Sequence, residues 1–237
     1  MQEEMQLGSI TIEVTRKEIK HVHLSVHPPM GRVTLVAPKG TRMEVARAYA
    51  ISRLAWIRRE QARFLGQARE GEKKFVSRES HHLWGRRYLL TVREVEAKPI
   101  VELTPRLLRL SVRPGSTSAK RAEVIHTWHK AQLHEVVPSL IQKWERKLGV
   151  KVSSYFLQRM KTKWGACNPK AGRIRLNTEL VKKPKDLLEY VVVHEMVHLL
   201  APTHSERFMA LMQKHYPNWR EARAELNALP LAREEWK

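Results

Sequence analysis

The segment 194–198 combines two histidines and a glutamate at a spacing that suits metal chemistry. It reads His-Glu-Met-Val-His, so His194 and His198 lie on one face of a helix, about one turn apart. Two imidazoles placed in this way reach the same tetrahedral metal ion. Glu195 lies about 100° around the helix from His194, beside the metal rather than on it. This position predicts a catalytic role for Glu195 as a general base that moves a proton from water to a leaving amine.

A catalytic zinc site needs a third protein ligand, because zinc there takes three protein ligands and leaves one position open. We predict His204 as this ligand. On a continuous helix it would lie about 240° around the axis from His198, on the wrong side. Pro202 cannot continue the helix, so the chain can turn and return His204 to the metal. Glu206 and Glu221 remain the alternatives, and three imidazoles with one water favour Zn2+ as the cofactor.

The helix that must carry this motif is predicted from periodicity. Apolar residues recur at helical spacing after Pro184, and Pro202 breaks the pattern. Short strands are predicted around 164–165 and 173–177 before this helix, and two further helices at about 204–215 and 218–228 after it. The metal motif is therefore expected on an apolar helix next to a small sheet.

The preceding part of the chain is predicted to be rich in strands. Residues 9–37 alternate as strands do, and 42–66 show helical spacing. A second strand set over 83–112 leads to a long amphipathic helix over 118–148, which Pro138 could kink or split. We find no internal repeat of 20–50 residues.

This order of elements predicts an α+β protein. We expect a β-rich N-terminal region with a helix over residues 1–115 and a region over 116–237 that carries the metal motif. The two regions are expected to form one continuous structural unit.

The chain resembles the YgjP-like metallopeptidase family, which is related to the SprT-like zincins. The resemblance extends over most of the chain and is strongest in the segments 159–167, 174–177, 190–199 and 204–208. Two positions depart from the family pattern: Thr203 stands where asparagine usually precedes the third histidine, and Met209 where an aromatic residue usually follows Phe208. Neither position is a predicted ligand.

The resemblance implies a minimal zincin-like core, in which a small sheet packs on the metal-binding helix and its edge strand holds an extended peptide substrate. We expect residues 173–177 to form that edge, because an edge strand offers unpaired N–H and C=O groups to a peptide. Asn177 either helps to fix the strand to the site or simply forms a turn. The predicted substrate-binding residues are Arg173, Ile174, Arg175, Leu176 and Asn177.

Charge is the strongest compositional feature. The 237 residues include 44 Lys and Arg against 24 Asp and Glu, a formal net charge of +20. Such a balance is typical of proteins that contact nucleic acid or acidic partners, but it also occurs on surfaces that are merely soluble.

Two classes of function follow. The first is a zinc-dependent metallopeptidase that acts on a protein or peptide substrate. The second is a basic protein associated with nucleic acid whose metal is structural. Glu195 favours the first, because a structural site has no use for that carboxylate. A protease recruited to DNA to cleave nucleic-acid-bound proteins combines both, as the likeness to the SprT-like enzymes implies.

Several features predict that the chain lies in the cytoplasm and not in a membrane. Its first residues are acidic and polar, where a secretory leader would be basic and then apolar. No stretch approaches the roughly 20 apolar residues of a membrane span. Cys167 is the only cysteine, which excludes an internal disulfide, and we predict a buried structural thiol there. The remaining histidine clusters, His81-His82, His126, His129 and His134, are predicted to lie on the surface.

Overall fold

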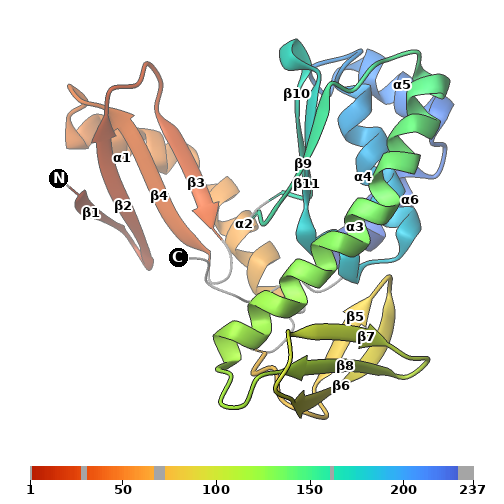
Figure 1. Ribbon diagram of the computed structural model, residues 1–237. Coiled ribbons are helices and arrows are strands. Elements are labelled where there is room, and N and C mark those ends of the chain that lie inside the picture. Colours follow the sequence, from red (N-terminus) through yellow and green to blue (C-terminus); the bar gives the residue numbers. More distant parts are fainter. Residues whose placement is uncertain (1, 28–30, 67–72, 161–162, 229–237) are drawn as a thin grey trace. The chain divides into compact units, whose positions relative to one another are not determined.

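The computed structural model describes residues 2–27, 31–66, 73–160 and 163–228. The chain divides into two compact units, Met1–Ala68 and Arg69–Glu234, and Figure 1 shows the elements of each. In both units a run of strands precedes the helices, which confirms the α+β fold class. The boundary predicted between residues 115 and 116 falls inside the second unit. In the described residues, we find no helix with the length and apolar character needed to cross a bilayer.

The first unit is a four-stranded sheet followed by two helices. The strands β1 (Gln2–Leu7), β2 (Ile10–Lys17), β3 (His23–His27) and β4 (Arg32–Pro38) lie in the order β1-β2-β4-β3. The strands β2 and β4 run parallel, and the other pairs are antiparallel. The predicted helix over 42–66 is divided at Arg53 into α1 (Met43–Ser52) and α2 (Leu54–Gly66). The core of this unit joins the inward residues of the sheet to those of the helices: Ile12, Val14, Val33, Leu35, Ala46, Ala50 and Ile57.

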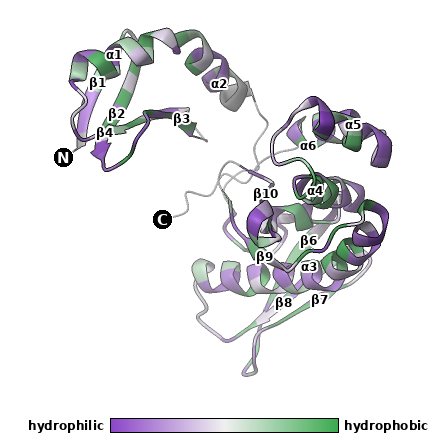
Figure 2. Ribbon diagram, turned by 90° about the horizontal axis from the view of Figure 1, so that it is seen from above, coloured by the Kyte–Doolittle hydropathy of each residue, from purple (hydrophilic) through white to green (hydrophobic). Residues whose placement is uncertain are grey.

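The second unit begins with another four-stranded sheet and the longest helix. The strands β5 (Ser80–Leu83), β6 (Arg86–Glu94), β7 (Ile100–Leu103) and β8 (Leu107–Val112) precede α3 (Ser118–Leu148). The Thr117 side chain caps α3, and Gly149 ends it at φ 67°. Pro138 lies inside α3 without interrupting it. The mixture of hydrophilic and hydrophobic residues along α3 is visible in Figure 2.

The two four-stranded sheets have the same topology. Their orders are β1-β2-β4-β3 and β5-β6-β8-β7, each with one parallel pair in the middle. Each sheet is followed by helix, and corresponding elements begin 75–78 residues apart, as for α1 at Met43 and α3 at Ser118. The chain therefore repeats one ββββα arrangement at a period longer than the 20–50 residues considered in the sequence.

A three-stranded sheet and three helices complete the second unit. The strands are β9 (Ser154–Gln158), β10 (Gly165–Asn168) and β11 (Arg173–Asn177), with the 3-10 helices η1 (Pro169–Ala171) and η2 (Thr178–Lys182) after β10 and β11. The helices are α4 (Lys185–Val197), α5 (Glu206–His215) and α6 (Trp219–Ala228). The predicted helices near 184–200, 204–215 and 218–228 are thus confirmed.

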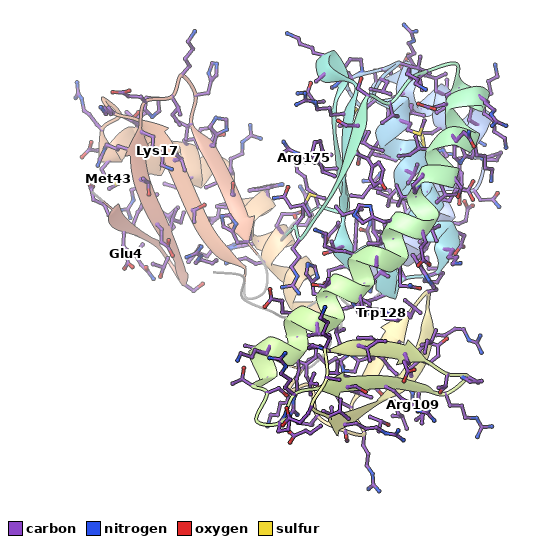
Figure 3. The ribbon with its side chains drawn as sticks, viewed as in Figure 1. Glu4, Lys17, Met43, Arg109, Trp128 and Arg175 are labelled. Carbon is purple, nitrogen blue, oxygen red and sulfur yellow. The ribbon has the colours of Figure 1, made fainter. Side chains whose placement is uncertain are left out.

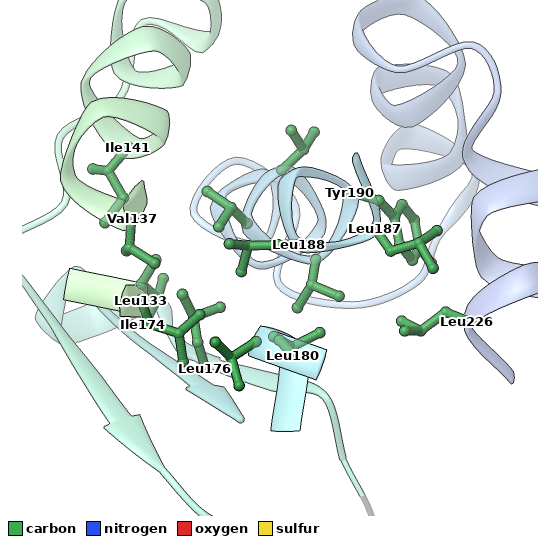
Figure 4. Close-up of a cluster of buried hydrophobic side chains, with 14 of the residues drawn as sticks. Leu133, Val137, Ile141, Ile174, Leu176, Leu180, Leu187, Leu188, Tyr190 and Leu226 are labelled. Atoms are coloured by element: carbon green, nitrogen blue, oxygen red, sulfur yellow. The ribbon is translucent and has the colours of Figure 1, made fainter. Parts of the chain in front are cut away.

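The core of the second unit lies between α3, α4 and the three-stranded sheet. Figure 4 shows Leu133, Val137 and Ile141 of α3 opposite the buried side chains of β11 and α4. Nine of the thirteen residues of α4 are buried. Full burial of one Val, Leu or Met side chain stabilises a fold by about 1.5–3 kcal/mol. The packing of these buried side chains therefore holds α4 firmly in place. The motif at 194–198 is therefore carried by a rigid element.

The prediction that residues 173–177 form an edge strand is wrong. The strand order is β10-β11-β9, so β11 lies in the middle. It pairs antiparallel with β10 through the tight connection at 169–172 and parallel with β9 on its other side. The alternating burial of β11 shows which face is inward, but it carries no information on how many neighbours the strand has.

Candidate metal centre

The helix α4 brings His194 and Glu195 into the interior of the second unit. The helix begins after Pro184, whose φ of −50° suits a helix start, and it carries Asp186 in its first turn, where a negative charge is favourable. His194 lies in its last turn, and His198 is the residue that caps its end. The ring centroids of His194 and His198 are 5.1 Å apart.

The chain turns sharply after α4 and returns His204 to the same place. The amides of Leu200 and Ala201 both donate to the carbonyl of Val197, which closes the end of the helix. The Ser205 side chain then accepts a hydrogen bond from the Phe208 amide and caps α5. His204 therefore lies in the short connection between the two helices, with its ring centroid 5.0 Å from that of His194 and 4.8 Å from that of His198.

The three histidines form a compact group of nitrogen donors. One ligand atom from each of His194, His198 and His204 lies within 4.8 Å of the others. The Nε2 atoms of His194 and His204 are 3.0 Å apart. In the part of the chain that the structure describes, this is the one group of three or more His, Cys, Asp or Glu with such spacing. It includes neither Glu206 nor Glu221, both of which are exposed.

Phe208 supports all three imidazoles. Its side chain is fully buried, and its ring centroid lies 5.0, 4.7 and 4.8 Å from those of His194, His198 and His204. The Nδ1 atom of His198 is 3.2 Å from the carbonyl oxygen of Ala201, so that ring is held by the turn and its Nε2 is the nitrogen left for a ligand. The aromatic support was not apparent from spacing, because Phe208 lies on a different helix.

The electrostatics of the group suit a metal ion. Burial, together with the neighbouring His198 and His204, lowers the pKa of His194 to about 3, and burial also lowers the pKa of His198. Neutral imidazoles present lone pairs, which metal binding requires. The residues present therefore fit a metal bound by three imidazoles.

The carboxyl group of Glu195 lies against the backbone of β10. A Cβ atom built on Gly165 would be 2.4 Å from Oε1 of Glu195 and 2.6 Å from its Cγ, so only glycine leaves room there. Glu195 is 6% exposed, and burial raises its pKa to about 8 against the opposing charge of Lys163. This contact between Gly165 and Glu195 becomes visible only in the structure, because the two residues lie 30 positions apart in the sequence.

Asn177 connects β11 to the loop before β10. Its Nδ2 donates to the carbonyls of Met160 and Lys163, each at 2.8 Å, and its Oδ1 accepts from the amide of Glu179 at 3.1 Å. Asn177 is buried, and it satisfies these groups as a buried amide must. It thus fixes the strand and also caps η2.

The other residues considered for chemistry lie outside the group. Cys167 is a free thiol that is half-buried against the core, and burial raises its pKa to about 11, which keeps it protonated. The prediction that the remaining histidines are on the surface is wrong for His81 and His129, which are both 5% exposed. Helical spacing alone did not reveal that α3 buries His129 against the first sheet of its unit.

Two histidines at this spacing on a helix, with a glutamate between them, are typical of a metallopeptidase. A model of the YgjP-like metallopeptidase domain matches residues 20–229, which is most of the chain. The chain belongs to the YgjP-like metallopeptidase family.

Two solved structures are similar in part. They are the metallopeptidase zymogens abylysin of Pyrococcus abyssi, at 23% identity with a TM-score of 0.36, and jannalysin of Methanocaldococcus jannaschii, at 18% identity with a TM-score of 0.34. Each likeness covers 38% of this chain and 91% or 92% of the other. A comparison with curated proteins found no match.

Proposed function

We propose that this chain is a zinc-dependent metallopeptidase that hydrolyses peptide bonds. The observation that carries the proposal is the group of three histidine nitrogens within 4.8 Å of one another, next to the buried carboxyl of Glu195 on the same helix. In this proposal His194, His198 and His204 hold the metal. Three neutral imidazoles favour zinc over magnesium or calcium, which prefer oxygen ligands.

Zinc at this position would act as a Lewis acid and lower the pKa of a water molecule in its open position. Glu195 performs the proton transfers. A carboxylate oxygen accepts a proton from the attacking water and later delivers it to the nitrogen of the leaving amine. The contact with Gly165 holds the carboxylate in one place, so its orientation is set before substrate arrives.

The substrate lies along β10 in this proposal, because β10 is an edge of the three-stranded sheet. Trp164 accepts a hydrogen bond from the amide of Asn177, which makes these two residues a hydrogen-bonded pair of the antiparallel ladder. Along an antiparallel ladder, hydrogen-bonded pairs alternate with non-hydrogen-bonded pairs. Gly165 and Cys167 belong to the non-hydrogen-bonded pairs. The N–H and C=O groups of Gly165 and Cys167 therefore point to the open side, where an extended peptide can pair with them next to Glu195.

Residues 173–177 support this arrangement from the neighbouring strand. Ile174 and Leu176 are buried and anchor β11 on the core, and Asn177 fixes the loop that leads into β10. Arg173 and Arg175 project to the other face, where they are exposed.

The replacement Glu195→Gln tests the function. We expect the variant to bind about one zinc per chain and to lose a factor on the order of 10²–10⁴ in peptide hydrolysis, because the amide cannot accept the proton. Metal analysis and a protease assay on the same preparation measure both quantities. The control is Glu206→Gln on α5, which should hydrolyse as fast as wild type. Full activity of Glu195→Gln would exclude this carboxylate from the reaction.

A further inference from the structure

The three-stranded sheet has one face that does not pack on the helices. Its exposed and half-exposed residues border a hollow of about 970 Å³, and we call this surface the open sheet face. Figure 3 shows Arg175 extending from β11 on the side away from α4. The residues that line the hollow include Phe156, Gln158, Ala166, Lys170, Arg173 and Arg175.

The open sheet face is strongly cationic. Lys170, Arg173 and Arg175 are exposed, and among the residues that the structure describes no acidic side chain lines the hollow. Within the described ranges, no ion pair involves any of these three side chains. Three unpaired positive charges on one concave surface attract an anionic group more strongly than isolated surface charges do.

The register of the strands leaves Arg175 more room toward β10, the edge strand, than toward β9. On β9 its cross-strand neighbour is Phe156, and on β10 it is Ala166. A phenyl ring fills the space on one side, whereas a methyl group leaves space on the other. The long arginine side chain therefore has room to lie over Ala166 and to reach beyond β10. Arg173 stands in the same relation to Asn168, whose side chain is turned back to cap η1.

The face is continuous with the strand that holds the substrate in the proposed function. Side chains alternate along β10, so Gly165 and Cys167 face α4 while Ala166 and Asn168 face the hollow. A peptide that pairs with β10 has the same alternation. Every second side chain of such a peptide projects onto the open sheet face. The Cβ atom of such a side chain lies about 5 Å from the Cβ atom of Ala166 or Asn168, whichever it faces across the strands.

We propose that the open sheet face selects peptide substrates with acidic side chains at alternate positions, through Arg175 opposite Ala166 and Arg173 two residues further along. This inference rests on the proposed peptidase function and names its substrate class. An acidic peptide is favoured over nucleic acid because the charges lie one strand away from the free backbone groups of β10, which a peptide pairs with and a phosphate backbone does not. The one exposed aromatic ring of the face, Phe156, offers little to a row of stacked bases.

Peptide binding to the full-length zinc-loaded Glu195→Gln protein tests the inference without turnover. The probes are three pools of fluorescein-labelled decapeptides in which every second residue is Glu, Gln or Lys. By fluorescence anisotropy at low salt, we expect the Glu pool to bind about fivefold more tightly than the Gln pool. This fold-change corresponds to one exposed charge pair at the upper end of the usual range. The preference should vanish at about 1 M NaCl, because salt screens exposed charges.

The added replacement Arg175→Glu should remove most of the preference for the Glu pool, because Lys170 and Arg173 are then accompanied by a carboxylate in place of a third cation. Arg146→Glu makes the same change in net charge on the exposed side of α3 and should leave the preference unchanged. Circular dichroism spectra of both proteins check that the fold is retained. Equal binding of the three pools to the Glu195→Gln protein would overturn the inference. An equal loss of the preference for the Glu pool in the Arg175→Glu and Arg146→Glu variants would overturn it as well.

Hydrolysis by the zinc-loaded wild type separates the two proposals. Equal binding of the pools together with hydrolysis of all of them would reject the acidic preference and retain the peptidase. Binding of the Glu pool through Arg175 without any hydrolysis would reject the peptidase and retain the anion-selective face. A single-stranded oligonucleotide that binds through Arg175, while the Glu pool does not bind, would assign the face to nucleic acid and overturn the inference.

Discussion

At the scale of single residues, the candidate site depends on close contacts between α4 and what surrounds it. Phe208 packs against the three imidazoles, and Gly165 leaves room for the Glu195 carboxyl. Neither residue is a metal ligand or a base. Both restrict where the reactive groups can lie, which is how a rigid scaffold prepares a site before substrate binds.

Gly165→Ala is expected to lower hydrolysis by about tenfold or more while the metal content stays near that of wild type. The new methyl group would meet Oε1 of Glu195 at 2.4 Å and must displace the carboxyl group, and small displacements of a catalytic group are costly. Hydrolysis rates and metal analysis measure the effect. The matched control is Gly40→Ala, where nothing lies within 4 Å of the added Cβ. If both variants hydrolyse equally fast, the contact has no role in orienting Glu195.

His204→Ala is expected to weaken zinc binding by about 10- to 100-fold or more, because a three-histidine site loses one of its ligands. Glu206→Ala and Glu221→Ala should keep wild-type affinity, since both glutamates lie outside the histidine group. Competition with a chromophoric chelator gives the three affinities. Loss of zinc from a glutamate variant, with retention in His204→Ala, would reassign the third ligand.

At the scale of elements, the antiparallel pair β10–β11 links the candidate site to the surface proposed to bind substrate. β10 presents its free edge and touches Glu195, and β11 carries the buried residues that hold the pair on the core. The sequence-based prediction placed the edge at residues 173–177 of β11, whereas the structure places it at β10, and this is the main correction. A peptide cannot pair with β11, because both of its edges are already occupied.

Asn177→Ala is expected to lower the free energy of unfolding by about 2–3 kcal/mol. The change leaves the carbonyls of Met160 and Lys163 without the donor that the buried Asn177 side chain supplies. Asn168→Ala is the control, because Asn168 also caps a 3-10 helix but is exposed, and it should cost about 1 kcal/mol or less. Urea unfolding curves provide both values. Equal destabilisation by the two changes would contradict the bridging role of Asn177.

At the scale of the whole molecule, the chain repeats one ββββα arrangement, and the residues of the candidate site follow the second copy in the sequence. The last helix of that copy, α3, packs on α4 and on the sheet that includes β10. The net charge of +20 belongs to the whole chain rather than to one segment. Association with nucleic acid stays a prediction from this charge.

Stability is expected to fall as the pH drops from about 6.5 toward 4, in part through His126 on α3. Burial lowers its pKa to about 4, and the charge of Arg159 acts in the same direction. The unfolded chain has the ordinary pKa of about 6.5, so it binds more protons than the folded chain within this window and is favoured there.

The variant His126→Gln isolates this contribution. Its amide oxygen can still accept the hydrogen bond that Arg159 donates to Nδ1, at 3.1 Å in the wild type, but it does not titrate. Relative to the variant, the wild type should lose about 1 kcal/mol between pH 6.5 and pH 5, a value reduced for the half-exposed ring. Urea midpoints of the two proteins at both pH values give this difference. Parallel pH profiles would show that His126 does not contribute.

The sequence by itself indicated most of the helices and strands and the spacing of the proposed metal motif. Periodicity predicted α3 and α4 because helical amphipathicity is a local property, and the spacing of His194 and His198 follows from helix geometry alone. Pro202 also indicated locally that the chain turns before His204.

Only the tertiary structure decided which strand is the edge, which glycine meets Glu195 and which histidines are buried. These properties depend on neighbours distant in sequence: β9 covers the second edge of β11, and α4 brings Glu195 to Gly165. An alternating strand pattern is the same for a central and an edge strand, because it records only the two faces of the sheet. The pairing is set by how the whole unit buries its core, so no single segment of the sequence contains it.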